Sequence, residues 1–465
     1  MRTSSGEVLI ELDRSRPRGL RAQIEDELRD AIRVGRLTPG TGLPSTRALA
    51  SDLGVTRGVV VAAYDQLLAE GYLLSRPGSG TVVNAAAATP TSDKPAPTDE
   101  ARIAVDFRPG VPDLSLFPRA AWLRASRAAF QTLPDEDLGY IDPRGLPQLR
   151  RAIVEYLGRV RGVTADAEHV VICNGFAHGL SVVIRALVDA GHESMAVEDP
   201  GHDGVCGELG WLGVRRHFVP VDNDGIVAER LGRTSARAVM LTPAHQFPTG
   251  AVLAPARRCS IVEWARSVDG YVIEDDYDAE YRYDRDPIGA MQGLAPDRVI
   301  YSGTLSKSLA PGLRLGWLVL PPALVQPIAT GRQHTDHATA SHAQATFLTF
   351  LTNGDLDRHL RRTRRIYRHR RDTLIAALAR WLPDATPSGI AAGLHVLVTL
   401  PDRLDEADVA ARARAAGVGI YPLSGYCTGD RDRATPAIVL GYGNLTPAAI
   451  EQGVRTLAHA VATAR

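Results

Sequence analysis

The chain has 465 residues, 45% of them hydrophobic and 23% charged, and its formal net charge is +0. This length allows two or three domains with buried cores, and the neutral balance excludes a chain-wide basic surface for nucleic acid or an anionic membrane. The four cysteines have no metal-ligand spacing, and there is neither an apolar leader nor a run of about 18 apolar residues. We therefore expect a cytoplasmic protein with reduced thiols, no bound metal and no membrane segment.

A break in composition divides the chain. Residues 84–104 are rich in Ala, Pro, Thr and Asp and show no apolar periodicity, which is typical of a semi-flexible linker. No internal repeat is found on either side of it. We therefore expect a small N-terminal domain over residues 10–83 and a larger domain over residues 105–465.

The N-terminal unit has the pattern of three helices and a hairpin. The apolar residues of the first helix recur at every fourth position: Leu20, Ile24, Leu28 and Ile32. This helix is expected to end at 37–40, a second to begin after Ser45 as N-cap, and a third to begin after Thr56. Two β-prone pieces, 72–74 and 81–83, flank a turn that contains Gly and Pro. The order predicts a winged helix-turn-helix.

A helix-turn-helix reads DNA by placing its second helix in the major groove. Arg57, near the start of that helix, can reach guanine O6 and N7, and Thr56 suits a phosphate. Arg47 on the preceding helix and Arg76 in the wing are candidates for contacts to the DNA backbone. Charge alone does not indicate DNA, because residues 1–84 hold 11 Arg against 10 Asp and Glu.

The motifs LPSTRALA, LGVTR, AYDQLLAEGYL and GSGT follow one another within residues 20–83. In this order and spacing they resemble the GntR-type winged helix-turn-helix of bacterial repressors. Gly58 departs from the family pattern, which often has a hydroxyl residue there. The resemblance implies double-stranded operator DNA as a partner, with DNA-facing positions at Arg47, Thr56, Arg57, Val59, Gly78 and Ser79.

The larger unit alternates short apolar runs with amphipathic helical stretches. The runs are HVVICNG, SMAVEDP, RAVMLTP, YVIEDDY, RVIYSGT and LGWLVLP. Such alternation predicts an α/β architecture with a mainly parallel sheet. Several runs end in acidic or small residues, at the strand ends where α/β folds place ligands.

Lysine is nearly absent from this chain. Of its 53 Lys and Arg residues, only Lys94 and Lys307 are lysine. Arginine stays protonated and cannot form an imine, whereas a desolvated lysine can lose its proton and act as a nucleophile. Lys94 lies in the linker, where a solvated charge is the simple interpretation. Lys307, in GTLSKSLAPGLRLGW, is the candidate reactive amine.

The residues near Lys307 include the partners that pyridoxal 5′-phosphate (PLP) requires. PLP needs an amine for its aldehyde, a carboxylate at the pyridine nitrogen, a donor to the 3′-oxygen and a phosphate cup. Asp275 or its neighbour Asp276 is the candidate carboxylate, since adjacent side chains on a strand point opposite ways. Tyr277 is a candidate donor to the 3′-oxygen.

The phosphate and the ring face have candidates as well. Thr304 and Arg314 offer a hydroxyl and a bidentate fork for the phosphate. His202 could lie over the face of the ring. The main-chain amides at an expected helix N-terminus would add to the phosphate cup, at Gly175, Phe176 and Ala177.

Seven further motifs lie between about 105 and 460: PGVPDLSLFP, GYIDPRGLPQLRRAI, NGFAHGL, VEDPGH, TPAHQFPTG, IEDDYDAEYRY and SGTLSKSLAPGLRLGW. Together they resemble fold-type I PLP enzymes of the aminotransferase class. A GntR-type head joined to such a body is similar to the MocR-type (GabR-like) transcriptional regulators. That resemblance implies PLP as cofactor, a smaller C-terminal α+β subdomain and a homodimer.

The resemblance also assigns roles. It implies that Lys307 forms the imine, Asp275 faces the pyridine nitrogen and Tyr277 faces the 3′-oxygen. The phosphate ligands would be Thr304 and Arg314, together with Tyr140 from the partner subunit.

Three positions depart from the aminotransferase pattern. Phe247 replaces the asparagine of the NPTG turn, so the 3′-oxygen is left to Tyr277, His245 or Gln246. His202 stands where the family usually has a stacking tyrosine. Val439 stands where aminotransferases carry the arginine that binds the substrate carboxylate, and the nearby arginines of the sequence are on an expected loop, Arg431 and Arg433.

Three functions compete on these grounds. The sequence favours a PLP-dependent transcriptional regulator that senses PLP or an amino compound through Lys307, with residual or half-transamination chemistry at most. The alternatives are an active aminotransferase with an accessory DNA-binding head and a DNA-binding dimer whose body has lost PLP. Val439 argues against the enzyme, because an unclamped substrate loses the orientation of its reacting bond. The complete set of PLP partners argues against the body without PLP.

Overall fold

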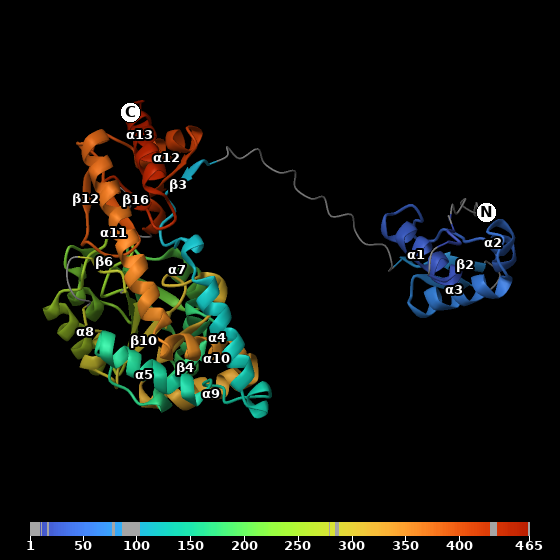
Figure 1. Ribbon diagram of the computed structural model, residues 1–465, viewed down its shortest axis with the longest axis horizontal. Helices are drawn as coiled ribbons and strands as arrows, with labels where there is room; N and C mark the ends of the chain where they lie inside the picture. Colours follow the sequence, from blue (N-terminus) through green and yellow to red (C-terminus); the bar gives the residue numbers. More distant parts are fainter. Residues whose placement is uncertain are drawn as a thin grey trace. The chain divides into compact units, whose positions relative to one another are not determined.

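The computed structural model describes residues 10, 12–15, 18–76, 80–85, 103–278, 280–283, 288–427 and 435–463. The chain divides into two compact units, Met1–Asp99 and Glu100–Arg465, and each is described by itself (Figure 1). Among the helices of the described residues, none combines the length and hydropathy needed to span a lipid bilayer. Outside the described residues lie most of the predicted linker and Gly78, Ser79, Lys94, Arg431 and Arg433.

The described residues of the smaller unit form three short helices and a two-stranded antiparallel hairpin. They are α1 (Leu20–Arg33), α2 (Thr46–Asp52), α3 (Arg57–Ala69), β1 (Leu73–Arg76) and β2 (Gly80–Val83). The apolar face predicted for the first helix lies in their core, where Ile24, Leu28 and Ile32 are at most 1% exposed. The predicted winged helix-turn-helix is confirmed.

Capping residues set the bounds of α2 and α3. Ser45 accepts a hydrogen bond from the main-chain nitrogen of Ala48 at 3.2 Å, as predicted for an N-cap. Thr56 occupies the N-cap position of α3, but its side chain makes no capping hydrogen bond. Gly54, between the two helices, has a φ of +61°, in the left-handed region that glycine adopts without strain. The turn therefore forms at little conformational cost.

A mainly parallel eight-stranded sheet lies at the centre of the larger unit, in the strand order β4-β11-β10-β9-β8-β5-β6-β7. The strands are β4 (Val170–Cys173), β5 (Ser194–Asp199), β6 (Arg215–Asp222), β7 (Gly225–Ile226), β8 (Ala238–Leu241), β9 (Tyr271–Asp276), β10 (Val299–Thr304) and β11 (Gly316–Val319). Strands β11 and β7 run antiparallel to their neighbours. All six predicted strands are present, and the predicted α/β fold is confirmed. The sequence does not predict β6, because this strand is largely exposed and lacks an apolar run.

Helices cover both faces of this sheet (Figure 1). One face carries α6 (Phe176–Asp189), α7 (Asp203–Trp211) and α9 (Pro322–Thr335). The other face carries α5 (Pro147–Arg161), α8 (Pro255–Ser267) and α10 (Ser341–Thr352). Helix α4 (Arg119–Thr132) packs against α10. Apolar side chains of both helix layers pack against the two faces of the sheet, and these contacts form the hydrophobic core of the larger unit.

A smaller α+β subdomain follows the long helix α11 (Asp355–Trp381). Its sheet has the order β12-β13-β16-β15, with β12 (Thr386–Ser388), β13 (His395–Thr399), β15 (Tyr421–Pro422) and β16 (Ala437–Gly441). Its helices are α12 (Glu406–Ala415) and α13 (Pro447–Thr463). The first strand of the larger unit, β3 (Val105–Asp106), pairs in parallel with β14 (Val418–Gly419). The beginning of the larger unit is thus tied to its C-terminal subdomain.

The carboxyl ends of β9 and β10 lie side by side. Their register pairs Asp275 with Ser302 and Asp276 with Gly303. Helix α6 begins next to them. Gly175, at its N-terminus, packs so closely against Gly316 of β11 that a Cβ atom on Gly316 would lie 3.2 Å from the Gly175 Cα. In α/β folds this edge of the sheet is where ligands bind. The fold therefore gathers the predicted residues around one space.

Candidate functional site

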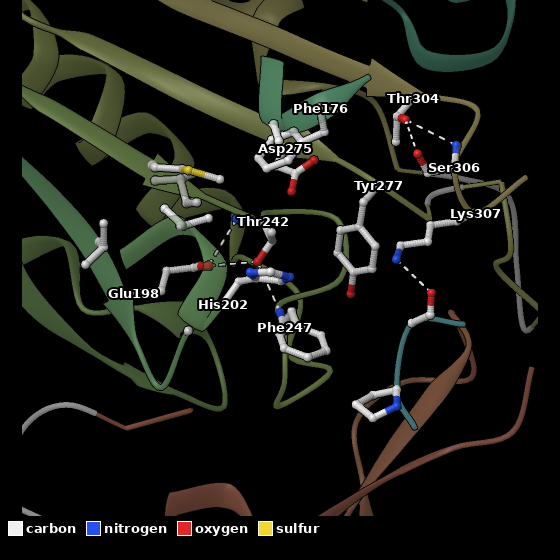
Figure 2. A pocket seen from close by; sticks show the side chains of 18 of the residues that line it. Phe176, Glu198, His202, Thr242, Phe247, Asp275, Tyr277, Thr304, Ser306 and Lys307 are labelled. Atoms are coloured by element: carbon white, nitrogen blue, oxygen red, sulfur yellow. Dashed lines mark hydrogen bonds between the residues drawn. The ribbon is translucent and has the colours of Figure 1, made fainter. Parts of the chain in front are cut away.

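A cavity of about 360 Å³ opens at this edge of the sheet (Figure 2). A hollow of a few hundred cubic ångströms is the usual size of a small-molecule site. The predicted residues that line it are Phe176, Ala177, His202, Asp275, Tyr277, Thr304, Lys307 and Arg314. Side chains far apart in the sequence therefore converge on one volume.

Lys307 follows β10 and reaches into the cavity (Figure 2). Its Nζ atom donates a 2.7 Å hydrogen bond to the main-chain carbonyl of Gly110. Burial lowers the pKa of Lys307, and the negative charges of Asp275 and Asp278 oppose that shift. A lysine with a lowered pKa gives up its proton more readily than a solvated one, as a nucleophilic amine must.

The adjacent carboxylates Asp275 and Asp276 have different surroundings. Asp276 is buried and accepts two 2.7 Å hydrogen bonds from Arg161 and one of 2.5 Å from the Tyr301 hydroxyl. Asp275 lines the cavity, and its Oδ1 atom is closed off from solvent without a hydrogen-bond partner. Burial and the neighbouring Asp276 raise the pKa of Asp275 well above its ordinary value. A buried acceptor without a partner is the place where a ligand proton fits.

Of the three candidates for the 3′-oxygen, Tyr277 is the one that lines the cavity. Gln246 is 1% exposed, and its amide donates to the carbonyl of Phe247 at 2.7 Å. His245 is 3% exposed, and its Nδ1 lies 2.9 Å from Asp278 Oδ2. Burial raises the pKa of Tyr277 well above its ordinary value, with Asp278 adding to the shift. The phenol therefore stays protonated and can donate.

Donors gather at the other end of the cavity. The Thr304 and Ser306 hydroxyls lie 2.9 Å apart. Arg314 approaches the start of α6 closely, since a Cβ atom on Gly175 would be 3.1 Å from its Nη1. The first main-chain N–H groups of α6, from Phe176 on, have no partner within the helix. Hydroxyls, a guanidinium and a helix N-terminus together make an anion site.

In the smaller unit, the side chains predicted to face DNA lie on the surface. Arg47, Thr56, Arg57 and Arg76 are exposed and Val59 is half-buried. Arg57 Nε donates to Thr46 Oγ1 at 3.4 Å, which links the starts of α2 and α3. The Thr56 hydroxyl makes no capping bond and so remains available at the helix N-terminus.

Comparison with known proteins covers both units. Residues 20–83 match the family model "Bacterial regulatory proteins, gntR family", and residues 110–435 match "Aminotransferase class I and II". The probable rhizopine catabolism regulatory protein MocR of Rhizobium meliloti is 34% identical over 97% of this chain and 95% of its own. The chain belongs to the MocR-type transcriptional regulators. The pyridoxine biosynthesis regulator PdxR of Corynebacterium glutamicum is also 34% identical, over 94% of each chain.

Solved structures agree with this assignment for the body of the regulator. Pyrococcus horikoshii kynurenine aminotransferase, in complex with PMP, superposes with a TM-score of 0.70 at 26% identity. It covers 77% of this chain and 90% of its own. An archaeal alanine:glyoxylate aminotransferase gives 0.70 at 25% identity, with 77% and 90% covered. This MocR-type regulator is therefore a DNA-binding protein with an aminotransferase-like, PLP-dependent body.

The cavity of the MocR-type regulator fits PLP at both ends. The unpartnered Oδ1 atom of Asp275 suits a protonated pyridine nitrogen. The donors around Arg314 and the start of α6 suit a phosphate. Lys307 reaches into the same cavity as the amine for the aldehyde (Figure 2).

Val439, at the position where the sequence comparison expects a carboxylate-binding arginine, does not line the cavity. Val439 on β16 is completely buried in a small apolar cluster with Leu397 and Ala437. Among the described residues that line the cavity, Arg314 is the one arginine, and it lies at the phosphate end.

Gly110 and Glu198 are among the lining residues that the sequence does not single out. Gly110 belongs to the motif PGVPD, but nothing in that motif indicates a contact with a lysine nearly 200 residues away. Glu198 is buried in the cavity wall and accepts hydrogen bonds from the nitrogen and hydroxyl of Thr242 at 3.1 and 2.7 Å. Burial raises the pKa of Glu198 to about 7. The motif VEDPGH, in which Glu198 is the second residue, is the feature of the sequence from which this position could have been predicted.

Proposed function

We propose that this regulator binds operator DNA through its winged head and that occupancy of the Lys307 cavity sets the affinity. The observation that carries the proposal is the convergence of Lys307, the unpartnered Asp275 and Arg314 in one cavity, in a chain that also has a helix-turn-helix. The signal is PLP or an amino compound that reacts at the same site. The protein acts in the cytoplasm, where the chromosome is.

In this proposal each end of the cavity has its own task. Lys307 holds the cofactor covalently, Asp275 keeps its pyridine nitrogen protonated and Tyr277 donates to its 3′-oxygen. When bound, PLP supplies an electrophilic carbon and an electron sink for amines. The phosphate is held by Thr304, Arg314 and the amides of Gly175, Phe176 and Ala177, and His202 covers one ring face.

The position of Val439 supports sensing over turnover. Without an arginine there, the described lysine and arginine of the cavity are Lys307 and Arg314, and these are assigned to the aldehyde and the phosphate rather than to the carboxylate of an amino acid in its reacting orientation. We therefore expect amines to bind without efficient transamination. Turnover with pairs of amino and keto acids, measured without DNA, distinguishes this expectation from an active aminotransferase with an accessory head.

Lys307 also contacts the segment that connects the body to the linker. The carbonyl that accepts its hydrogen bond belongs to Gly110, and residues 103–110 lead back toward the head. The main-chain nitrogen of Phe107 donates to the carbonyl of Gly419 at 2.9 Å, which fixes this segment to the C-terminal subdomain. Covalent attachment leaves at most one hydrogen on the nitrogen through which Lys307 contacts Gly110 and changes its direction. We propose that loss of this contact couples the cavity to the linker, which is a coupling free energy between two sites.

Exposed apolar residues support a homodimer. Among the described residues, five of the ten large apolar side chains that are exposed lie between positions 114 and 140: Leu114 (48% exposed), Leu123 (68%), Phe130 (60%), Leu138 (59%) and Tyr140 (91%). Exposed apolar surface of this kind marks protein contacts. Tyr140 does not line the cavity of its own chain. We propose that a second copy covers this surface and that Tyr140 completes the partner's phosphate cup, so that two heads bind two half-sites.

Substitutions in the head should separate base reading from backbone contact. Arg57→Ala is expected to weaken operator binding by about 1–3 kcal/mol and to relax the preference at one base, because a bidentate guanine contact is lost. Arg76→Ala should weaken all sequences alike and reduce the salt slope by roughly one, because a phosphate contact is lost. The measurement is selection from a random library followed by titrations at several salt concentrations. Equal loss of specificity in both variants would contradict this division.

The experiment that tests the proposed function compares the operator affinity of one preparation with and without PLP and repeats the comparison across a panel of amines. A change with PLP or with any amine supports sensing at the Lys307 cavity. If neither PLP nor any amine changed the operator affinity, the proposal that the Lys307 cavity controls DNA binding would be wrong.

A further inference from the structure

A buried pair of side chains behind Tyr277 has no part in the proposed cofactor contacts. His245 Nδ1 lies 2.9 Å from Asp278 Oδ2, and both side chains are 3% exposed. The Tyr277 hydroxyl lies 3.2 Å from the same Nδ1 and donates to the main-chain carbonyl of His245 at 3.1 Å. Tyr277 itself points into the cavity between Asp275 and Lys307 (Figure 2). Polar contacts therefore connect Asp278 in the interior, through His245, to Tyr277 at the cavity.

The contact with Asp278 fixes the proton of the imidazole. An ionised carboxylate only accepts hydrogen bonds, so the 2.9 Å contact places a hydrogen on Nδ1. That nitrogen then cannot accept from Tyr277, which accounts for donation of the hydroxyl to the carbonyl instead. His245 thus offers the Tyr277 hydroxyl no acceptor at Nδ1, which leaves the hydrogen for the main-chain carbonyl or for a ligand oxygen in the cavity.

Close packing holds the pair in this geometry. Gly393 has a φ of +68°, and a Cβ atom there would collide with the His245 ring and with Asp278 Oδ2. His395 of β13 packs on the His245 ring, with centroids 4.9 Å apart. Burial lowers the pKa of His395 well below its ordinary value, and His245 lowers it further. The neighbour of the pair is therefore a neutral ring.

Charged groups from several elements surround Tyr277, His245 and Asp278. Burial raises the pKa of Tyr277, and the charges of Asp278, Asp275 and Glu198 raise it further. Asp278 also opposes the lowering of the Lys307 pKa by burial. On the interior side, a small hollow beside Asp278 and His245 is lined by two arginines, Arg161 and Arg282. The charge of Asp278 is thus felt at the cavity although its side chain lies behind Tyr277.

We propose that Asp278 and His245 are positioning residues for Tyr277. Asp278 keeps a hydrogen on His245 Nδ1, so that this nitrogen does not compete for the Tyr277 hydrogen, which can pass from the main-chain carbonyl to the 3′-oxygen when PLP is bound. The pair thereby takes the place of the asparagine that aminotransferases carry where this chain has Phe247. The inference rests on the proposed PLP site.

The test compares two substitutions of Asp278 that differ only in hydrogen bonding. Asp278→Asn removes the charge but keeps an acceptor for His245 Nδ1, whereas Asp278→Ala removes both. Any direct effect of the charge on Lys307 is the same in both variants, so the difference between them isolates the positioning contact. The readout is the pH midpoint of the visible absorbance of the PLP-loaded full-length protein.

The expected result has a defined sign. A hydroxyl that donates to the 3′-oxygen weakens the hold of that oxygen on the proton at the Lys307 nitrogen, so loss of the oriented hydroxyl raises the midpoint. The midpoint of Asp278→Ala should therefore lie about half a unit above that of Asp278→Asn. In proteins that also carry Tyr277→Phe, the difference should disappear.

Two results would overturn the proposal: equal midpoints for the two Asp278 variants, or a difference that persists without the Tyr277 hydroxyl. If Asp278→Ala does not fold, Asp278→Leu, which also removes the acceptor but fills more of the aspartate's volume, replaces it in the same comparison and is again expected to have the higher midpoint. The titration needs no DNA. Its failure therefore leaves the regulator assignment intact, and failure of the DNA response leaves the titration result intact.

Discussion

Purified Lys307→Ala protein should carry no covalently attached PLP while keeping its fold and its basal DNA binding. Lys307 is the single lysine outside the predicted linker, and burial lowers its pKa in a cavity that fits the cofactor. The head belongs to a separate compact unit, so its fold does not depend on this side chain. The measurement is borohydride reduction followed by peptide mass spectrometry. The wild type should show a pyridoxyl adduct on the peptide that contains Lys307, and the variant should show none.

Lys94→Ala provides the matched control, because it removes the one other lysine of the chain. This variant should keep the full adduct on the Lys307 peptide. An adduct of unchanged amount in Lys307→Ala protein would contradict the assignment, since the cofactor would then be held by another amine.

Mixed dimers of Tyr140→Ala and Lys307→Ala chains should recover part of the covalent PLP that both parents lack or hold weakly. If Tyr140 serves the cavity of the other subunit, a heterodimer contains one cavity with both residues intact and one with neither. Exposure of 91% for a tyrosine that does not line its own cavity is the observation behind this expectation. Retention of PLP is measured after gel filtration of purified heterodimers that carry two different affinity tags.

The control for this complementation is a heterodimer of Lys307→Ala chains with wild-type chains, which should retain PLP at one cavity. Heterodimers of the two variants that retain no more PLP than the better parent would mean that each cavity is built from a single chain. In that case the exposed apolar surface of α4 would need another partner.

Much of the head could be predicted from the sequence because local signals determine it. Ile24, Leu28 and Ile32 recur with the period of a helix, and they are buried as expected. Ser45 caps α2, and Gly54 forms the turn to α3 through a positive φ. Each signal acts over a few residues, so it can be recognised without the tertiary structure.

The cavity could be predicted in outline for a different reason. Parallel strands of an α/β sheet end at one edge, so polar residues that follow apolar runs meet there. Alternation along β9 shows that Asp275 and Asp276 point opposite ways, but it does not show which of them faces the ligand. In the structure, Asp276 pairs with Arg161, which lies 115 positions earlier in the sequence, and Asp275 is therefore the carboxylate that lines the cavity.

Contacts between distant segments could not be predicted. The hydrogen bond of Lys307 to Gly110 joins residues 197 positions apart, and the Asp278–His245 pair joins residues 33 apart. Neither contact follows from the chemistry of the side chains, because both depend on how loops at the sheet edge pack. These are also the contacts from which the coupling to the linker and the orientation of Tyr277 are inferred.

The most direct test of the account is the dissociation constant of the selected operator for one wild-type preparation with and without PLP, at a fixed salt concentration. The account predicts that PLP changes this constant by about 5- to 150-fold, which corresponds to a coupling of about 1–3 kcal/mol. Lys307→Ala protein, measured alongside, should show no such change. Equal dissociation constants for wild-type protein with and without PLP would contradict control of DNA binding by the Lys307 cavity.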